Sequence, residues 1–203
     1  MVNIKGLSKK TIDPNPFGQF DKWFKERLNA GIPIPNTVSL GTATTDGWVS
    51  VRTVLLKDYD ENGFVIFTDY NSKKGLHLLS NRRAALLFYW PESGRQVRIE
   101  GFADKVSEQE SESYFKTRLR ESQLSAWASE QSSVIPDRDH LEKRYAFYKN
   151  RFFDKPVDKP QHWGGFRIVP DLFEFWQEGD FRLHDRLAYT KGINVWVIER
   201  LAP

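Results

Sequence analysis

The sequence contains no cysteine among its 203 residues. Disulfide bonds, thiolate catalysis and zinc sites with cysteine ligands are therefore excluded. The chain also lacks a run of about 18 apolar residues, which a membrane-spanning helix requires. Its opening stretch, MVNIKGLSKK, contains no apolar segment of the kind that export signals carry. We therefore expect a protein with no membrane partner, located in the cytoplasm.

Several motifs that bind phosphate or activate nucleophiles are missing as well. No GxGxxG follows a predicted strand, and neither GxxxxGK[ST] nor GxSxG occurs. The four histidines lack the spacing of metal ligands, so we predict no metal site. The formal net charge is +3, and basic residues are mixed with acidic ones, so we expect no nucleic-acid partner. Any phosphate bound here must be held mainly by side chains.

Aromatic residues, in contrast, are abundant, with 15 Phe and 7 Trp in a chain that is 39% hydrophobic. This composition is typical of a folded globular protein with large rings in its core or in a pocket. The chain is long enough for one domain and too short for two of ordinary size. We predict a single domain over residues 1–203, with residues 1–14 as a short, flexible N-terminal arm.

Strand patterns at hairpin spacing dominate both ends of the sequence. A helix comes first, over residues 15–31, because Asn15 can cap it and Pro16 suits its first turn. Its apolar face is predicted to carry Phe17, Phe20, Trp23, Phe24 and Leu28. Strands are predicted over 37–57 (as a hairpin), 63–69, 83–90, 95–106, 165–169, 172–177, 181–191 and 194–201, and helices over 72–81, 107–118, 120–130 and 137–152. We therefore predict a mainly β protein, an antiparallel barrel with added helices.

The stretch FRLHDRLAYTK, residues 181–191, indicates a ligand. Side chains alternate between the two faces of a strand. A strand here would place Arg182, His184 and Arg186 on one face, and Leu183, Asp185 and Leu187 on the other. Cationic groups in such a row repel one another unless an acceptor lies between them, so we expect them to bind something.

Three further stretches offer anion-binding side chains. They are Arg52 and Lys57 on one predicted strand, Lys73 and Lys74 at a helix N-terminus, and Tyr114, Arg118 and Ser122 at helical spacing. Free backbone N–H groups at a helix start favour an anion, and hydroxyls beside a guanidinium make a plausible phosphate clamp. For each cation taken alone, a solvated surface charge is the simpler interpretation, and Arg118 is also compatible with an ion pair to Glu110 or Glu121.

Taken in chain order, these stretches resemble one family. The motifs are RTVLLK, SKKG, RQVRIEG, YFKTRLRESQ, QSS, WGG, EFWQ, RLHDR and a terminal RLAP. Their order and spacing, from about residue 13 to Pro203, resemble those of pyridoxine 5′-phosphate oxidases. The pair EFWQ and RLHDR is the most specific part of the resemblance.

The resemblance implies a fold, a cofactor and an activity. The fold would be an FMN-binding split β-barrel, as a homodimer with FMN at the subunit interface and contacted by both chains. The activity would be oxidation of pyridoxine 5′-phosphate or pyridoxamine 5′-phosphate to pyridoxal 5′-phosphate. Hydride would pass from C4′ to flavin N5, and O₂ would reoxidise the flavin and give H₂O₂.

The resemblance also implies roles for individual residues. Those that match the family's FMN contacts are Arg52, Thr53, Val54, Leu55, Leu56, Lys57, Phe67, Thr68, Lys73, Lys74, Gln96, Gln131, Ser132, Trp176 and Arg186. Those that match its contacts to the substrate phosphate are Lys57, Tyr114, Arg118 and Ser122. Arg182 and His184 match substrate-binding and catalytic residues: Arg182 would lie flat over the pyridine ring, and His184 would hydrogen-bond a ring substituent.

The sequence departs from the family pattern at several positions. Leu119 replaces a proline, Ser125 a glycine, Glu178 a glycine after EFWQ, and Lys73 an arginine that could bind phosphate with two hydrogen bonds. The family's N-terminal arm, which folds over the substrate, has no counterpart here.

Two alternative functions are compatible with the same motifs. One is a related flavin oxidase acting on another reduced heteroaromatic, such as a dihydrophenazine. The other is a protein that binds flavin or pyridoxal phosphate without catalysis. The retained phosphate clamp favours a pyridoxine 5′-phosphate oxidase over a dihydrophenazine oxidase, because a substrate without phosphate would not need the clamp.

Overall fold

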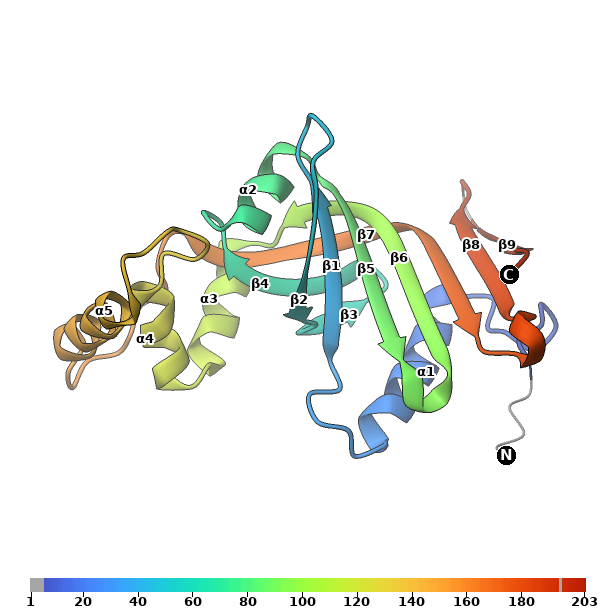
Figure 1. Cartoon of the computed structure of the whole chain (residues 1–203), viewed down its shortest axis with the longest axis horizontal. Coiled ribbons are helices and arrows are strands. Elements are labelled where there is room, and N and C mark those ends of the chain that lie inside the picture. The colour runs from blue at the N-terminus through green and yellow to red at the C-terminus, as the bar shows by residue number, and fades with distance from the viewer. Residues whose placement is uncertain (1–5, 194) are drawn as a thin grey trace.

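The computed structural model describes residues 6–193 and 195–203, and in these residues nine strands pair antiparallel in one curved sheet (Figure 1). The main order is β2-β1-β5-β6-β7-β4-β3, and β8 pairs with both β7 and β9. The strands are β1 (Thr37–Ala43), β2 (Val49–Leu55), β3 (Asp58–Asp60), β4 (Gly63–Asp69), β5 (Arg83–Trp90), β6 (Arg95–Lys105), β7 (Trp163–Gln177), β8 (Asp185–Lys191) and β9 (Trp196–Arg200). The predicted antiparallel, mainly β fold is confirmed.

The helices cover separate parts of this sheet. They are α1 (Pro16–Asn29), α2 (Lys73–Ser80), α3 (Glu108–Thr117), α4 (Arg120–Ala128) and α5 (Arg138–Arg151), with 3-10 turns at η1 (Pro91–Ser93) and η2 (Asp180–Arg182). Helices α3, α4 and α5 gather at one end of the molecule, and β8 and β9 lie at the other (Figure 1). No helix in the described part of the chain is long and apolar enough to cross a membrane.

Helix α1 begins as predicted and fills the concave side of the sheet. The Asn15 side chain accepts a hydrogen bond from the Phe17 N–H, and Pro16 occupies the first helical position. Phe20 and Phe24 are buried, and their rings pack against the aromatic side chains of β4 and β5. Leu28, predicted on the same face, is 45% exposed, because it lies beyond the end of this contact.

Strand β7 is one continuous element, although the sequence predicted two strands. It has 15 residues, and β6 pairs along most of it. On its other edge, β4 pairs with its first half and β8 with its second half. Pro170, which cannot donate a ladder hydrogen bond, lies next to the register shift at Glu100/Gly101, where the ladder is already interrupted. The proline is therefore tolerated inside the strand.

The prediction of a flexible arm over residues 1–14 is corrected for residues 6–14. The Leu7 N–H donates to Asp185 Oδ2 at 2.9 Å, and the Tyr189 hydroxyl donates to the Asp13 carbonyl at 2.6 Å. Leu7 and Ile12 are also buried in the main core. Burial and hydrogen bonds to β8 hold this segment against the end of the sheet. Residues 1–5 lie outside the described residues.

Replacing Gly101 with alanine is expected to destabilise the protein. A Cβ at this position would lie 2.1 Å from the Val169 carbonyl oxygen and 2.8 Å from Pro170 Cα, both backbone atoms that cannot rotate away. We expect the free energy of unfolding in urea to fall by about 1–3 kcal/mol or more. Gly41→Ala is the matched control, because its nearest contact would be an ordinary 3.6 Å to Ala85. Equal stability of the two variants would contradict this interpretation of β7.

Candidate functional site

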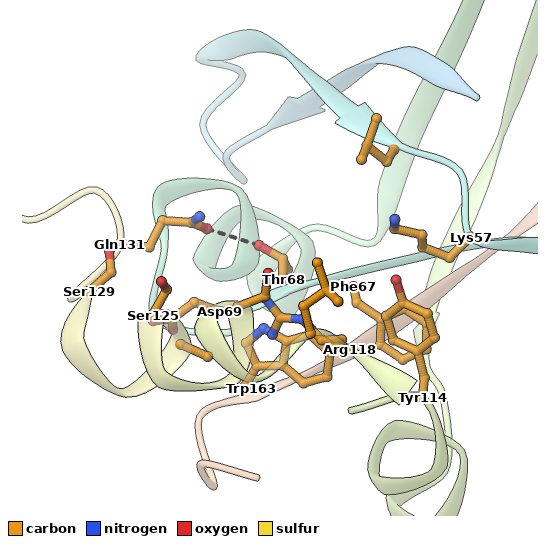
Figure 2. A pocket seen from close by; sticks show the side chains of 14 residues that line it. Lys57, Phe67, Thr68, Asp69, Tyr114, Arg118, Ser125, Ser129, Gln131 and Trp163 are labelled. Atoms are coloured by element: carbon orange, nitrogen blue, oxygen red, sulfur yellow. Dashed lines mark hydrogen bonds between the residues drawn. The ribbon is translucent and has the colours of Figure 1, made fainter. Parts of the chain in front are cut away.

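A cavity of about 560 Å³ opens between the start of β7, strand β4, the end of β2 and helices α3 and α4 (Figure 2). Its lining includes eight of the predicted site residues: Leu55, Lys57, Phe67, Thr68, Tyr114, Arg118, Ser122 and Gln131. These residues come from four separate stretches of the sequence. The fold therefore brings the predicted phosphate clamp and part of the predicted flavin contacts into one space.

The clamp is not one helical face, as the sequence spacing predicted. Helix α3 ends at Thr117, Arg118 has an extended backbone (φ −72°, ψ 149°), and α4 begins at Arg120. The Gln123 side chain donates to the Phe115 carbonyl at 3.0 Å and holds the two helices together at this break. Tyr114 and Ser122 still reach the cavity, but from two helices that meet at Arg118. Leu119 occupies the N-cap position of α4, so this break forms without the family's proline.

Arg118 has no acceptor of its own within the described residues. Its Nη1 is buried without a hydrogen-bond partner, and the alternative of an ion pair with Glu110 or Glu121 is not found in the described chain, since Glu110 pairs with Arg167. Burial lowers the pKa of its guanidinium. The group lies over the Trp163 ring, with Cζ 4.7 Å from the ring centroid, as Figure 2 shows. A half-buried guanidinium that lies on a ring and whose buried Nη1 lacks an acceptor is suited to an anionic ligand.

Three nearly parallel rings form one wall of the cavity. The Phe67 centroid lies 4.0 Å from that of Tyr114 and 5.4 Å from that of Trp163, with interplanar angles of 16° and 9°. Lys57 Nζ lies 5.8 Å from the Tyr114 centroid. No ion pair is found for Lys57 in the described chain. The wall thus combines flat apolar surfaces with a second cation that lacks a counter-ion.

A further pair of cations lies behind the cavity. Lys74 Nζ donates to Gln131 Oε1 at 2.6 Å and to Thr68 Oγ1 at 3.2 Å, and these are neutral oxygens. Burial and the nearby charge of Arg52 lower the pKa of Lys74. Arg52 itself donates to Thr42 Oγ1 and to the Leu40 carbonyl, and no carboxylate binds it in the described structure. The charge of Asp69 opposes this lowering of the Lys74 pKa, but no carboxylate is bonded to either cation in the described residues. Two such neighbouring cations are suited to a phosphate.

A second group of predicted residues forms a row across β6, β7 and β8. Gln96 is opposite Trp176, and Trp176 is opposite Arg186, so the three side chains share one face of the sheet. Arg186 Nε donates to Glu174 Oε1 at 2.9 Å, and its Nη1 donates to the Ala202 carbonyl at 2.8 Å. The hydrogen bond from Arg186 to Glu174 raises the pKa of Arg186. We call Gln96, Trp176 and Arg186 the cross-strand row.

Arg182 and His184 do not lie on a strand, which corrects the prediction for residues 181–191. Strand β8 begins only at Asp185, and η2 precedes it, with Phe181 and Arg182 both left-handed at φ 55° and 64°. Residues between Gln177 and Asp185 make the connection that returns the chain antiparallel to β7. Of the predicted face only Arg186 belongs to the strand.

The turn nevertheless brings His184 next to the cross-strand row. Its ring centroid lies 4.7 Å from that of Trp176. The Gly179 N–H donates to His184 Nδ1 at 3.2 Å. Because Nδ1 accepts this bond, the neutral imidazole carries its proton on Nε2 and can donate from there. Asp185 lies on the opposite face of β8, as predicted, and pairs there with Arg200.

Within one chain, the cavity and the cross-strand row lie far apart. Trp163 begins β7 in the cavity, and Trp176 lies near its far end. These two residues are separated by roughly 40 Å along the strand, at about 3.3 Å per residue. Within a single chain, the predicted substrate residues of the cavity and those of the turn therefore lie at opposite ends of the sheet (Figure 1).

The remaining predicted flavin residues surround the cavity less directly. Leu56 is 3% exposed and Val54 packs against the main core, so only their backbone atoms can face a ligand. Thr53 and Lys73 are exposed, and Ser132 follows Gln131 with a left-handed backbone (φ 75°). Lys73 thus stands at the first position of α2 as predicted, with its side chain in solvent.

Sequence reasoning missed two residues that the structure places in these groups. Trp163 supports Arg118 in the cavity, and Glu174 binds Arg186 beside the cross-strand row. The motifs WGG and EFWQ contain them, but neither motif reveals that its side chain contacts an arginine distant in sequence. Asp69, Leu119, Ser125, Ala126 and Ser129 also line the cavity.

Two of the departures from the family pattern have clear structural settings. The Ser125 hydroxyl donates to the Glu121 carbonyl at 2.8 Å, so it is satisfied inside α4. Glu178 packs at the η1 turn, where its Oε2 lies 2.9 Å from the position of a Cβ on Gly94. Its carboxylate therefore lies against this turn.

Comparison with known proteins gives a consistent result. The family model for pyridoxamine 5′-phosphate oxidase matches residues 24–149, and the model for the pyridoxine 5′-phosphate oxidase C-terminal dimerisation region matches residues 163–203. The pyridoxine/pyridoxamine 5′-phosphate oxidase of Burkholderia orbicola is 53% identical over 200 residues, which cover 97% of this chain and 93% of that protein. The enzyme of the same name from a Nostoc species is 50% identical over 201 residues, which cover 98% and 94%.

Solved structures show the same architecture. PhzG from Burkholderia lata, in complex with tetrahydrophenazine-1-carboxylic acid, has a TM-score of 0.92 and 29% identity, over 100% of this chain and 99% of that one. A pyridoxamine 5′-phosphate oxidase-related, FMN-binding protein from Nostoc punctiforme has a TM-score of 0.73 at 14% identity, which indicates the fold alone. Two family models match the two parts of the chain, and relatives about half identical match nearly its full length. The chain therefore belongs to the pyridoxine/pyridoxamine 5′-phosphate oxidase family.

Proposed function

We propose that the protein is an FMN-dependent oxidase that converts pyridoxine 5′-phosphate or pyridoxamine 5′-phosphate to pyridoxal 5′-phosphate. The observation that carries the proposal is the set of uncompensated cations around one cavity. Arg118 and Lys57 line it, and Arg52 and Lys74 lie behind it, all without a carboxylate partner in the described residues. Two phosphorylated ligands need two such anion sites.

The donor set behind the cavity fits the phosphate of FMN. Lys74 and Arg52 would bind it, with the α2 N-terminus, Thr68 and Gln131 as further hydrogen-bonding groups. Ser72 caps that helix by accepting from the Gly75 N–H, so the remaining N–H groups of the first turn are free for a ligand. Lys73 and Ser132 are placed at the edge of the same site.

The front of the cavity fits the phosphate of the substrate. Arg118 would supply its unpartnered Nη1, while Lys57, Tyr114 and Ser122 would complete the clamp. The Trp163 ring holds the Arg118 guanidinium in place from one side without occupying any of its N–H donors. Those donors therefore remain available to phosphate oxygens.

We propose that a second subunit completes the site. The cross-strand row lies within residues 163–203, which match the family's dimerisation region. In a homodimer, Trp176, Arg186 and Gln96 of the partner subunit would face the flavin ring. Arg182 and His184 of the partner subunit would then meet the substrate whose phosphate is held by Arg118.

The protein's part in the reaction is binding, orientation and charge. When bound, FMN supplies the hydride acceptor, and O₂ returns the flavin to its oxidised state with release of H₂O₂. Arg182 would press the pyridine ring against the flavin and so hold C4′ close to N5. His184 would donate a hydrogen bond from Nε2 to a ring substituent, since its Nδ1 is occupied by Gly179. No protein nucleophile is required.

The direct test uses purified protein and both ligands. We expect a yellow protein that consumes O₂ with pyridoxine 5′-phosphate and forms an aldehyde and H₂O₂ in equal amounts. Pyridoxine, which lacks the phosphate, is the matched control and should react far less well at equal concentration. Ligand binding without turnover would instead identify a storage or delivery protein.

The similarity to PhzG gives a second candidate function. That protein binds tetrahydrophenazine-1-carboxylic acid, so oxidation of a reduced phenazine carboxylate is the alternative for this chain. The clamp of Lys57, Arg118 and Ser122 favours a phosphate over a single carboxylate, because it offers more donors than two oxygens accept. Turnover of a dihydrophenazine carboxylate, with none of pyridoxine 5′-phosphate, would favour the alternative.

A further inference from the structure

Glu174 is a buried carboxylate to which the proposed reaction gives no role. Only 3% of its surface is exposed, on β7 two residues before Trp176. Its Oε1 accepts from Arg186 Nε at 2.9 Å, and its Oε2 accepts from Arg98 Nη1 at 2.9 Å. A carboxylate shared by two guanidiniums inside a sheet is costly to bury, so its retention calls for an explanation.

The sheet register places Glu174 directly beside the cross-strand row. Arg98 is opposite Glu174, and Glu174 is opposite Ala188. Each lies two residues from a member of the row on its own strand, so all share that face. Arg98 is also paired with Glu100. Beside the cross-strand row there is thus a second line of side chains, in which Arg98 and Glu174 are charged and held by ion pairs.

Two of the three nitrogens of the Arg186 guanidinium are hydrogen-bonded within the chain, and the third is free within the described residues. Nε is bound to Glu174, and Nη1 is bound to the Ala202 carbonyl at 2.8 Å. No partner is found for Nη2 in the described structure. Because the guanidinium is planar, these two hydrogen bonds fix the direction in which Nη2 can donate to a ligand.

Arg186 differs from the cations of the cavity because its charge is compensated by a carboxylate. Arg52, Lys74 and Arg118 have no carboxylate partner, which suits a phosphate. Arg186 is neutralised by Glu174, so it offers a directed N–H but little net charge. Such a group is suited to a neutral acceptor on a ring. The pKa of Arg186, which this contact raises, keeps the donor protonated.

We propose that Glu174 is a positioning residue, which orients Arg186 so that it hydrogen-bonds the ring of the flavin and not its phosphate. The inference rests on the proposed function, because it takes FMN as the ligand of Arg186. It adds a residue that acts only through Arg186, and it states which part of the cofactor that arginine recognises.

The test measures flavin binding to the apoprotein by quenching of flavin fluorescence. Glu174→Gln should weaken FMN binding by about tenfold or more, the effect of losing one charge-assisted hydrogen bond. Riboflavin, which has the same ring and no phosphate, should be weakened by the same factor. Lys74→Met should weaken FMN and leave riboflavin unchanged. A Glu174→Gln variant that loses FMN but not riboflavin would overturn the assignment to the ring.

Two controls separate positioning from general damage. Glu100→Gln removes the other carboxylate from Arg98 and leaves Arg186 untouched, so its flavin binding should equal that of the wild type. Arg186→Lys keeps the charge but cannot hold the fork on Glu174, so it should bind flavin as weakly as Glu174→Gln does. It also serves if the latter fails to fold. Wild-type binding by Arg186→Lys would overturn the inference.

A double variant distinguishes failure of the inference from failure of the proposed function. If Glu174 acts through Arg186, Glu174→Gln combined with Arg186→Ala should bind FMN no more weakly than Arg186→Ala alone. Additive losses would show that Glu174 acts by another route, and the inference would fail. Wild-type FMN affinity in Arg186→Ala would instead contradict the placement of Arg186 at the flavin.

Discussion

Replacing Arg118 with alanine is expected to raise the KM for pyridoxine 5′-phosphate by about 10- to 100-fold, which corresponds to roughly 1.5–3 kcal/mol for a hydrogen bond to a charged group. The reason is the position of its guanidinium, which lies over Trp163 with Nη1 buried and unpartnered. Bound FMN should remain in place, because Lys74 and Arg52 form a separate anion site. Steady-state kinetics and the flavin absorbance of the same preparation measure both effects.

Two controls test whether Arg118 binds the phosphate: a variant of a nearby lysine and a substrate without phosphate. Lys116→Ala removes a nearby cation that does not line the cavity, and its KM should stay at the wild-type value. For pyridoxine, which has no phosphate, Arg118→Ala should change kcat/KM very little. If Arg118→Ala loses FMN, or slows pyridoxine as much as its phosphate ester, Arg118 binds another part of the site.

Replacing Arg182 with alanine should reduce kcat/KM by about 100-fold, because small errors in the approach of reacting atoms have effects of that size. The loss should appear in kcat as well as KM, and the protein should stay yellow, since Arg182 is not placed at the cofactor. Its left-handed backbone, shared with Phe181, sets the direction of its side chain. Non-glycine residues rarely adopt this conformation, and such strain is concentrated at functional sites.

His184 provides the comparison for Arg182. His184→Ala should cost only about 0.5–1.5 kcal/mol in kcat/KM, the value of one neutral hydrogen bond. His184→Gln should recover part of this loss, because a glutamine amide can place an N–H close to the position of Nε2. Near wild-type kcat/KM in Arg182→Ala, or no difference between the two His184 variants, would contradict the roles assigned to the turn.

Most of the fold was predictable because local signals agreed with the tertiary structure. Asn15 and Pro16 marked the start of α1, and Ser72 that of α2, through backbone hydrogen bonds that the structure contains. Gly47, in the turn of the hairpin predicted over residues 37–57, has a positive φ of 91°, which suits a glycine. Capping and turn chemistry depend on a few neighbouring residues, so a sequence can carry them.

The turn from Phe181 to His184 was not predictable in the same way. Alternating polar and apolar residues are compatible with a strand, and neither Phe181 nor Arg182 is of a type that favours a left-handed backbone. The geometry follows from closing β7 onto β8, which is a contact between distant parts of the chain. The separate helices predicted over 107–118 and 120–130 agree with α3 and α4, but the helical spacing of Tyr114, Arg118 and Ser122 did not show that the clamp crosses the break between them.

Only part of the candidate site could be predicted from the sequence. Cations and hydroxyls at suitable spacing indicated anion binding, but the sequence alone could not show that Lys57, Arg118 and Thr68 surround one cavity. It also could not show that Arg118 lacks a counter-ion while Arg186 has one. That difference depends on which carboxylates the fold brings near, and on it rests our proposal of a phosphate ligand for Arg118 and a ring ligand for Arg186.

The length of β7 has a genetic consequence. Because its two ends lie far apart, each chain of the proposed dimer gives its cavity to one flavin site and its cross-strand row to the other. A subunit altered at Arg118 and a subunit altered at Arg186 are then each defective as homodimers. When the two are produced in one cell, a mixed dimer contains one site with both lesions and one site with neither. Two defective alleles of this protein should therefore complement each other, which alleles of an enzyme with its whole site in one chain cannot do in this way.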